Sequence, residues 1–83
     1  MWHLDSEFRS ANRAERRFAN GYELIVFDLP AANGYPAQIG WELFGGTGYS
    51  TLMASGQAAS LSEAKDACEA ALVQRWLLEI RRR

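Results

Sequence analysis

Metal-binding and redox-active side chains are scarce in this chain of 83 residues, which has one cysteine and one histidine. The lone Cys68 excludes an intramolecular disulfide and is typical of the reducing cytoplasm. One cysteine and one histidine cannot complete a closed zinc site. His3 stands near a chain end, whereas general-base chemistry needs a histidine held between a nucleophile and a carboxylate. No apolar run approaches the ~20 residues that span a bilayer. We therefore expect a cytoplasmic protein with no enzymatic activity, no cofactor and no membrane partner.

Lysine is also scarce, because eight of the nine basic residues are arginine, and charge is spread unevenly along the chain. Residues 1–20 carry a net charge of +1, residues 21–74 of −5 and residues 75–83 of +3. A chain of this length forms one domain with a thin core. We assign that domain to residues 1–83, with an N-terminal arm at 1–4 and a basic tail at 81–83.

Three segments have the residue types of β-strands. Residues 22–28 are rich in β-branched and aromatic side chains that alternate between two faces. Residues 37–44 and 49–55 follow as a hairpin around a glycine-rich turn at 45–48. Residues 29–36 contain two prolines and an Asn-Gly pair, which predicts a loop.

Residues 5–19 have the composition of a helix, because they are rich in helix formers and poor in β-branched side chains. Asp5 or Ser6 could cap this helix, and Asn20-Gly21 supplies the left-handed residue that often ends one. The alternative is that residues 19–22 form a hairpin turn between two strands.

The last third of the chain predicts one long helix that begins at Ser60. Ser60 and Glu63 have the spacing of a capping box, and apolar residues then recur every three or four positions. Small residues dominate the first half of this helix and large apolar residues the second. A helix of twenty-odd residues spans about 30 Å, against about 20 Å for a short strand, so its second half should project beyond the sheet.

These elements predict an α+β fold: a three-stranded antiparallel sheet in α-β-β-β-α order, with the long C-terminal helix packed on one face. Such a sheet cannot also cover the apolar residues at 72–80. Either the first helix packs there or another chain does, and a homodimer through residues 72–80 would satisfy the second solution.

The predicted element order is that of the double-stranded RNA-binding domain, and residues 56–72, GQAASLSEAKDACEAAL, resemble the closing segment of that family. The resemblance implies a lysine cluster at the start of the last helix that grips phosphates across the major groove. Here Lys65 stands between Glu63 and Asp66 instead. Because phosphate contacts supply most of such affinity, we do not expect nucleic acid to bind this face.

Residues 41–72, from WELFGG to EAAL, also resemble a recurrent type of small uncharacterised phage and bacterial accessory protein. In that type, a hairpin with a central tryptophan precedes a helix with the pattern S-x-x-E-A. The resemblance implies a phage or mobile-element protein without a catalytic motif, and anti-CRISPR proteins are drawn from this class. We therefore expect a small protein that binds and inhibits or modulates a host protein.

Three features are candidates for the partner-binding surface: the second face of the sheet, the loop around residue 35, and the far end of the last helix. Exposed apolar patches mark interaction sites, and tryptophan is enriched at their hot spots. The second sheet face carries Ile25, Phe27, Phe44, Tyr49 and Met53, the loop carries Tyr35, and the helix end carries Trp76, Leu77 and Ile80. The alternative for the sheet face is that the predicted first helix covers it and its residues belong to the core.

The alternative function is that of a nucleic-acid-binding accessory protein that uses the arginines of the predicted first helix and of the basic tail. These residues are Arg9, Arg13, Arg16, Arg17, Arg81, Arg82 and Arg83.

Overall fold

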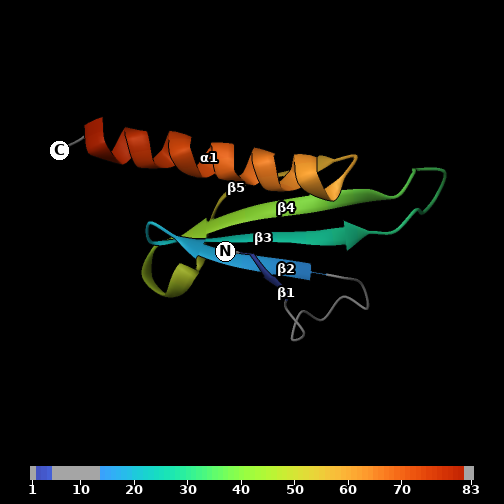
Figure 1. The fold of residues 1–83 in the computed structure, drawn as a ribbon, viewed down its shortest axis with the longest axis horizontal. Coiled ribbons are helices and arrows are strands. Elements are labelled where there is room, and N and C mark those ends of the chain that lie inside the picture. The colour runs from blue at the N-terminus through green and yellow to red at the C-terminus, as the bar shows by residue number, and fades with distance from the viewer. Residues whose placement is uncertain (1, 5–13, 82–83) are drawn as a thin grey trace.

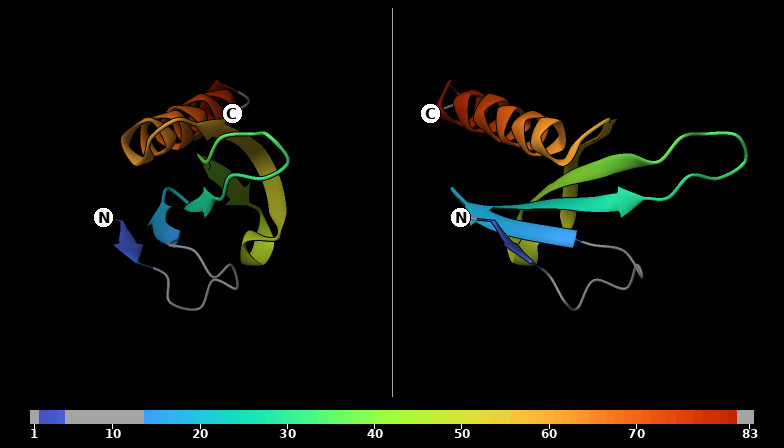
Figure 2. Two further views of the ribbon diagram at one scale, coloured as in Figure 1. Left: turned by 90° about the vertical axis from the view of Figure 1, so that its right-hand side faces the viewer. Right: turned by 45° about the vertical axis from the view of Figure 1, so that its right-hand side comes forward.

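The computed structural model describes residues 2–4 and 14–81. In this part of the chain, five strands form one antiparallel sheet in which sequence neighbours pair, and a single helix follows (Figure 1). The elements are β1 (His3–Leu4), β2 (Ala14–Ala19), β3 (Tyr22–Leu29), β4 (Gln38–Gly45), the 3-10 helix η1 (Thr47–Tyr49), β5 (Thr51–Ala58) and α1 (Leu61–Arg81). The helix α1 lies across one face of the sheet, over β3, β4 and β5 (Figure 2).

The predicted three-stranded sheet in α-β-β-β-α order is wrong. The described residues form a five-stranded sheet, and residues 14–19, predicted as the end of the first helix, are the strand β2. Residues 5–13, the rest of that predicted helix, lie outside the described residues. The element order that suggested a double-stranded RNA-binding domain therefore does not hold.

A two-residue turn explains why β2 is extended. Asn20 and Gly21 have φ values of 53° and 82°, and two positive φ values in succession make the type I′ turn, whose twist matches that of a β-hairpin. The turn places Ala19 opposite Tyr22, and the pairing then continues to the start of β2. Helix propensity is a weak preference that strand pairing of this extent overrides.

The other predicted elements are confirmed with small shifts of their ends. The strands β3, β4 and β5 correspond to the three predicted strands, and β5 begins two residues late because η1 occupies the turn before it. The backbone N–H of Glu63 donates to Ser60 Oγ at 3.2 Å, so α1 begins with the predicted cap. In the predicted loop, Ala32 and Tyr35 exchange two backbone hydrogen bonds and form a small hairpin of their own.

The core lies between the sheet and the first half of α1. Leu24 and Val26 of β3, Leu43 of β4 and Cys68 of α1 are fully buried. Ala64 is buried beside them, and its small side chain lets the helix approach the strands closely. Two of the three buried residues of α1 are thus small, namely Ala64 and Cys68, and the third is Leu72.

A β-bulge decides which face Met53 occupies. Leu43 pairs with Ala54 but Phe44 pairs with Leu52, so Met53 is the extra residue in β5. Its side chain packs against the core, and Arg75 Nη2 lies 3.3 Å from its Sδ. The prediction that Met53 lies on the sheet face opposite the long helix is therefore wrong.

Candidate protein-binding face

Two ion pairs join β2 to one side of α1. Lys65 Nζ lies 2.8 Å from Glu15 Oε1, and Arg17 pairs with Glu69. The spacing of the partners is the same on both elements. Two residues along a strand and four residues along a helix both cover about 6–7 Å. Lys65 also lies over the ring of Trp2, 5.5 Å from its centroid. These contacts hold one side of α1 toward β2.

The same side of α1 becomes exposed further along the helix. We name Val73, Trp76, Leu77 and Ile80 the helix stripe, because their spacing of three, four and seven residues places them on one side of the helix. Each of the four is 42–51% exposed. The strand β2 ends at Ala19, and α1 projects past the strands (Figure 1). The stripe is therefore apolar surface that the described sheet leaves open.

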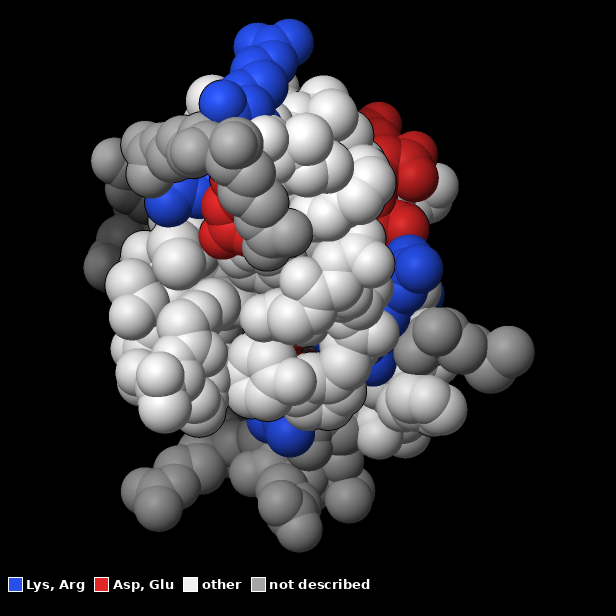
Figure 3. All heavy atoms as spheres, turned by 90° about the vertical axis from the view of Figure 1, so that its left-hand side faces the viewer, with Lys and Arg blue, Asp and Glu red and all other residues white. Residues whose placement is uncertain are grey.

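Further apolar side chains gather at the end of the molecule where α1 ends. Phe18 and Tyr49 are exposed and contact each other there, with ring centroids 5.2 Å apart, and Leu52 is exposed as well. Figure 3 views this end directly, and uncharged side chains occupy its centre while charged ones lie toward its margin. This end is the largest concentration of exposed apolar side chains in the described residues.

The structure separates the predicted partner-binding residues into three groups. Trp76, Leu77 and Ile80 belong to the helix stripe, and Tyr49 lies at the same end of the molecule. Tyr35 is 77% exposed in the β3–β4 connection, which projects from the opposite end (Figure 2). The buried or half-buried remainder consists of Ile25, Phe27, Phe44 and Met53.

Sequence reasoning missed Val73, although its spacing from Leu77 and Ile80 was available. It also missed Phe18, because residues 5–19 were predicted to form a helix that packs within the fold. On the second sheet face, for which core and interface were both considered, Ile25 is only 5% exposed and Phe27 and Phe44 are half-buried.

The predicted arginines do not form one basic face among the described residues. Arg16 Nε lies 3.2 Å from Glu23 Oε2, whereas Arg17 pairs with Glu69 on the helix-covered face. Arg81 is exposed at the end of α1. The other four predicted residues, Arg9, Arg13, Arg82 and Arg83, lie outside the described residues.

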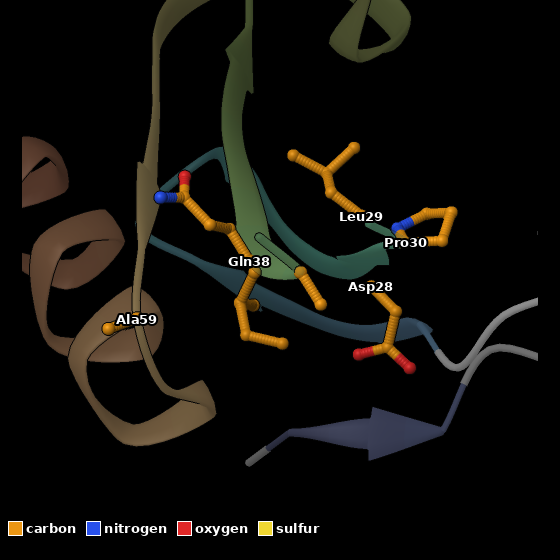
Figure 4. A pocket seen from close by; sticks show the side chains of 7 residues that line it. Asp28, Leu29, Pro30, Gln38 and Ala59 are labelled. Carbon is orange, nitrogen blue, oxygen red and sulfur yellow. The ribbon is translucent and has the colours of Figure 1, made fainter. Parts of the chain in front are cut away.

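The sites that could serve catalysis are poor in reactive groups. A shallow hollow of about 380 Å³ opens beside the β3–β4 connection, and Asp28 is the only ionisable residue among its described lining residues (Figure 4). No cluster of three His, Cys, Asp or Glu side chains suited to a metal ion occurs within residues 2–4 and 14–81. This hollow offers hydrogen bonds and apolar contact.

Cys68 is a structural thiol. Its Sγ donates to the backbone carbonyl of Glu42 at 3.4 Å, and the side chain is fully buried. Burial raises the pKa of the thiol to about 12, an effect only partly offset by a hydrogen bond with the Ile25 backbone. The thiol therefore stays protonated at neutral pH and is a poor nucleophile.

No protein-family model, curated protein or solved structure matches this chain. Within the described ranges, no helix is long and apolar enough to cross a membrane. The helix stripe is therefore the feature of the described residues that best indicates a function.

Proposed function

We propose that this chain is a small non-enzymatic protein that binds a partner protein through the helix stripe. The observation that supports it is the exposure of four large apolar side chains, at i, i+3, i+4 and i+7, on a helix whose first half is held by the core and two ion pairs. Helices that recognise protein partners present anchors at this spacing. Trp76 is a typical hot-spot residue, since tryptophan buries a large area when a partner covers it.

The consequence of binding is inhibition or modulation of a host protein. This part of the proposal, and an origin among phage or mobile-element proteins of the anti-CRISPR kind, draws its support from the resemblance of residues 41–72. A cytoplasmic location draws its support from the single, reduced Cys68.

Affinity capture from a bacterial lysate tests the binding face with two matched variants. Leu77→Glu places a charge in the helix stripe, and Tyr35→Glu places one at the opposite end of the molecule. Both positions are solvent-exposed, so both variants should fold. We expect Leu77→Glu to lose the captured protein and Tyr35→Glu to keep it. Loss with Tyr35→Glu alone would place the binding surface at the β3–β4 connection and contradict the proposal.

The alternative function, nucleic-acid binding through arginines, has less support because Arg16 and Arg17 are already paired with glutamates. Binding of DNA or RNA at physiological salt provides its test. Micromolar affinity that falls steeply with added salt would favour this alternative over protein binding.

A further inference from the structure

We propose that the partner of the helix stripe is a second copy of this chain, with the two α1 helices packed antiparallel. This inference rests on the proposed function, because it names the partner of the same face. Its basis is the order of side chains along the outer surface of α1. Asp66 is exposed and precedes the stripe, Arg81 is exposed and follows it, and Glu69 is already paired with Arg17. The apolar stripe is thus preceded by an exposed acidic residue and followed by an exposed basic one.

In an antiparallel pair, the two apolar stripes face each other, and the acidic residue before one stripe lies near the basic residue after the other. If Trp76 of one copy lies opposite Leu77 of the other, Val73 lies opposite Ile80. Arg81 then lies about 9 Å along the axis from Asp66 of the second copy, at a rise of about 1.5 Å per residue. An extended arginine side chain can span such an offset. The sequence adds two more arginines after Arg81, which increases the positive charge at this end.

A parallel pair lacks this match. It would place Arg81 beside Arg81 of the second copy and Asp66 beside Asp66, so like charges would repel at both ends of the stripe. The apolar contacts would be similar in both arrangements. Charge therefore selects the antiparallel one.

The area of the helix stripe limits the affinity expected for the dimer. Four side chains that are each about half exposed form a patch of a few hundred Å². Stable interfaces bury roughly 800 Å² on each partner, so the stripe supports a weak dimer that forms with rising concentration.

Sedimentation equilibrium across a wide concentration range tests whether the pair exists. The wild-type chain should approach a doubled mass at the highest concentrations. Leu77→Glu should weaken association at least about tenfold, because it buries a charge in an apolar contact, and Tyr35→Glu should leave it unchanged. A wild-type chain that stays monomeric throughout, or a dimer that Leu77→Glu leaves intact, would overturn the proposal.

Disulfide cross-linking tests the direction of the helices. Val73→Cys and Ile80→Cys are prepared as separate variants, one with a tag that changes its mass, and the buried Cys68 stays unreactive in both. An antiparallel pair should cross-link in the mixture and in neither variant alone. Residue 73 of one chain lies opposite residue 80 of the other, but about 10 Å along the axis from residue 73 of the other. Efficient cross-linking of Val73→Cys with itself would show a parallel pair and refute the proposed arrangement.

The two proposals fail in different ways. If the chain is monomeric but Leu77→Glu abolishes capture of another protein, the helix stripe binds protein and self-association is wrong. If Leu77→Glu changes neither the mass nor the captured proteins, both proposals are wrong.

Discussion

The two halves of α1 are both apolar, yet one forms the core and the other faces solvent. The buried residues are Ala64, Cys68 and Leu72, and two of these three are small. The second half holds larger side chains, including Trp76 and Ile80, and these are exposed. Size and apolarity therefore do not identify the core of this helix. The side of the helix does, because in the second half the residues that contact the strands are Arg75, against Met53, and Glu79, against Tyr22, while the large apolar side chains are exposed.

The largest expected effect comes from truncating one leucine in each half. Leu72 packs in the core with Leu24, Leu43 and Cys68, so Leu72→Ala should lower the free energy of unfolding by about 2–4 kcal/mol through lost contacts and a residual cavity. Leu77→Ala removes the same atoms from a half-exposed site and should change it by less than about 0.5 kcal/mol. Urea denaturation at low micromolar protein concentration measures both. Equal losses would mean that the two halves are buried alike.

Enlarging an alanine in the first half tests how closely α1 approaches the sheet. Ala64 is fully buried, and Ala64→Leu should destabilise the fold by about 1–3 kcal/mol because the added atoms have no room. Ala70→Leu makes the same change at an exposed position of the same helix and serves as the control. Thermal unfolding followed by circular dichroism compares the two. A stable Ala64→Leu variant would show that the contact between helix and sheet is loose.

The smallest expected effect is a decrease in stability at alkaline pH. It reports on the burial of Cys68 and therefore tests whether the first half of α1 is buried. Its pKa is raised from 9.0 to about 12 by burial, so the folded chain keeps a proton that the unfolded chain loses. The stabilisation is complete below about pH 9 and is lost as the pH rises toward 12. The free energy of unfolding should fall by about 1 kcal/mol between about pH 8 and about pH 10.

Cys68→Ala provides the control for this measurement, because it should remove most of the pH dependence. Tyr22 retains a smaller dependence in the same direction. Its pKa is raised first by burial and then by its hydrogen bond to Glu79, at 2.6 Å, and by the charge of that carboxylate. An unchanged slope in Cys68→Ala would show that the thiol does not titrate as proposed.

Local signals predicted α1 and the strands β3 to β5 correctly. The cap at Ser60, the periodicity from Leu61 onward and the β-branched and aromatic residues of β3 act over a few residues, and their effects survive in the structure. The prediction for segment 14–19 failed because its helix-forming composition is also local, whereas its strand conformation depends on pairing with β3 and on contacts with the distant helix α1. Glu15 and Arg17 pair with Lys65 and Glu69, about fifty residues away.

The candidate site was predictable in part. The excess apolar surface at 72–80 followed from the length of the helix compared with that of a strand, and Trp76, Leu77 and Ile80 are exposed as that comparison indicates. The position of Met53 was not predictable, because a one-residue bulge in β5 reverses the face of the side chain it displaces.

The sequence by itself determined the capped helix α1, whose hydrogen bonds close within a few residues. It predicted a helix end at Asn20-Gly21 with a hairpin turn as the alternative, and the structure has the turn. Only the tertiary structure decided that residues 14–19 are a strand and that the helix stripe lies open. Both depend on what packs beside them, because strand pairing and burial are interactions with other segments of the chain. The last buried residue of α1 is Leu72, and beyond it the helix contacts the sheet through Arg75 and Glu79, so its large apolar side chains remain at the surface.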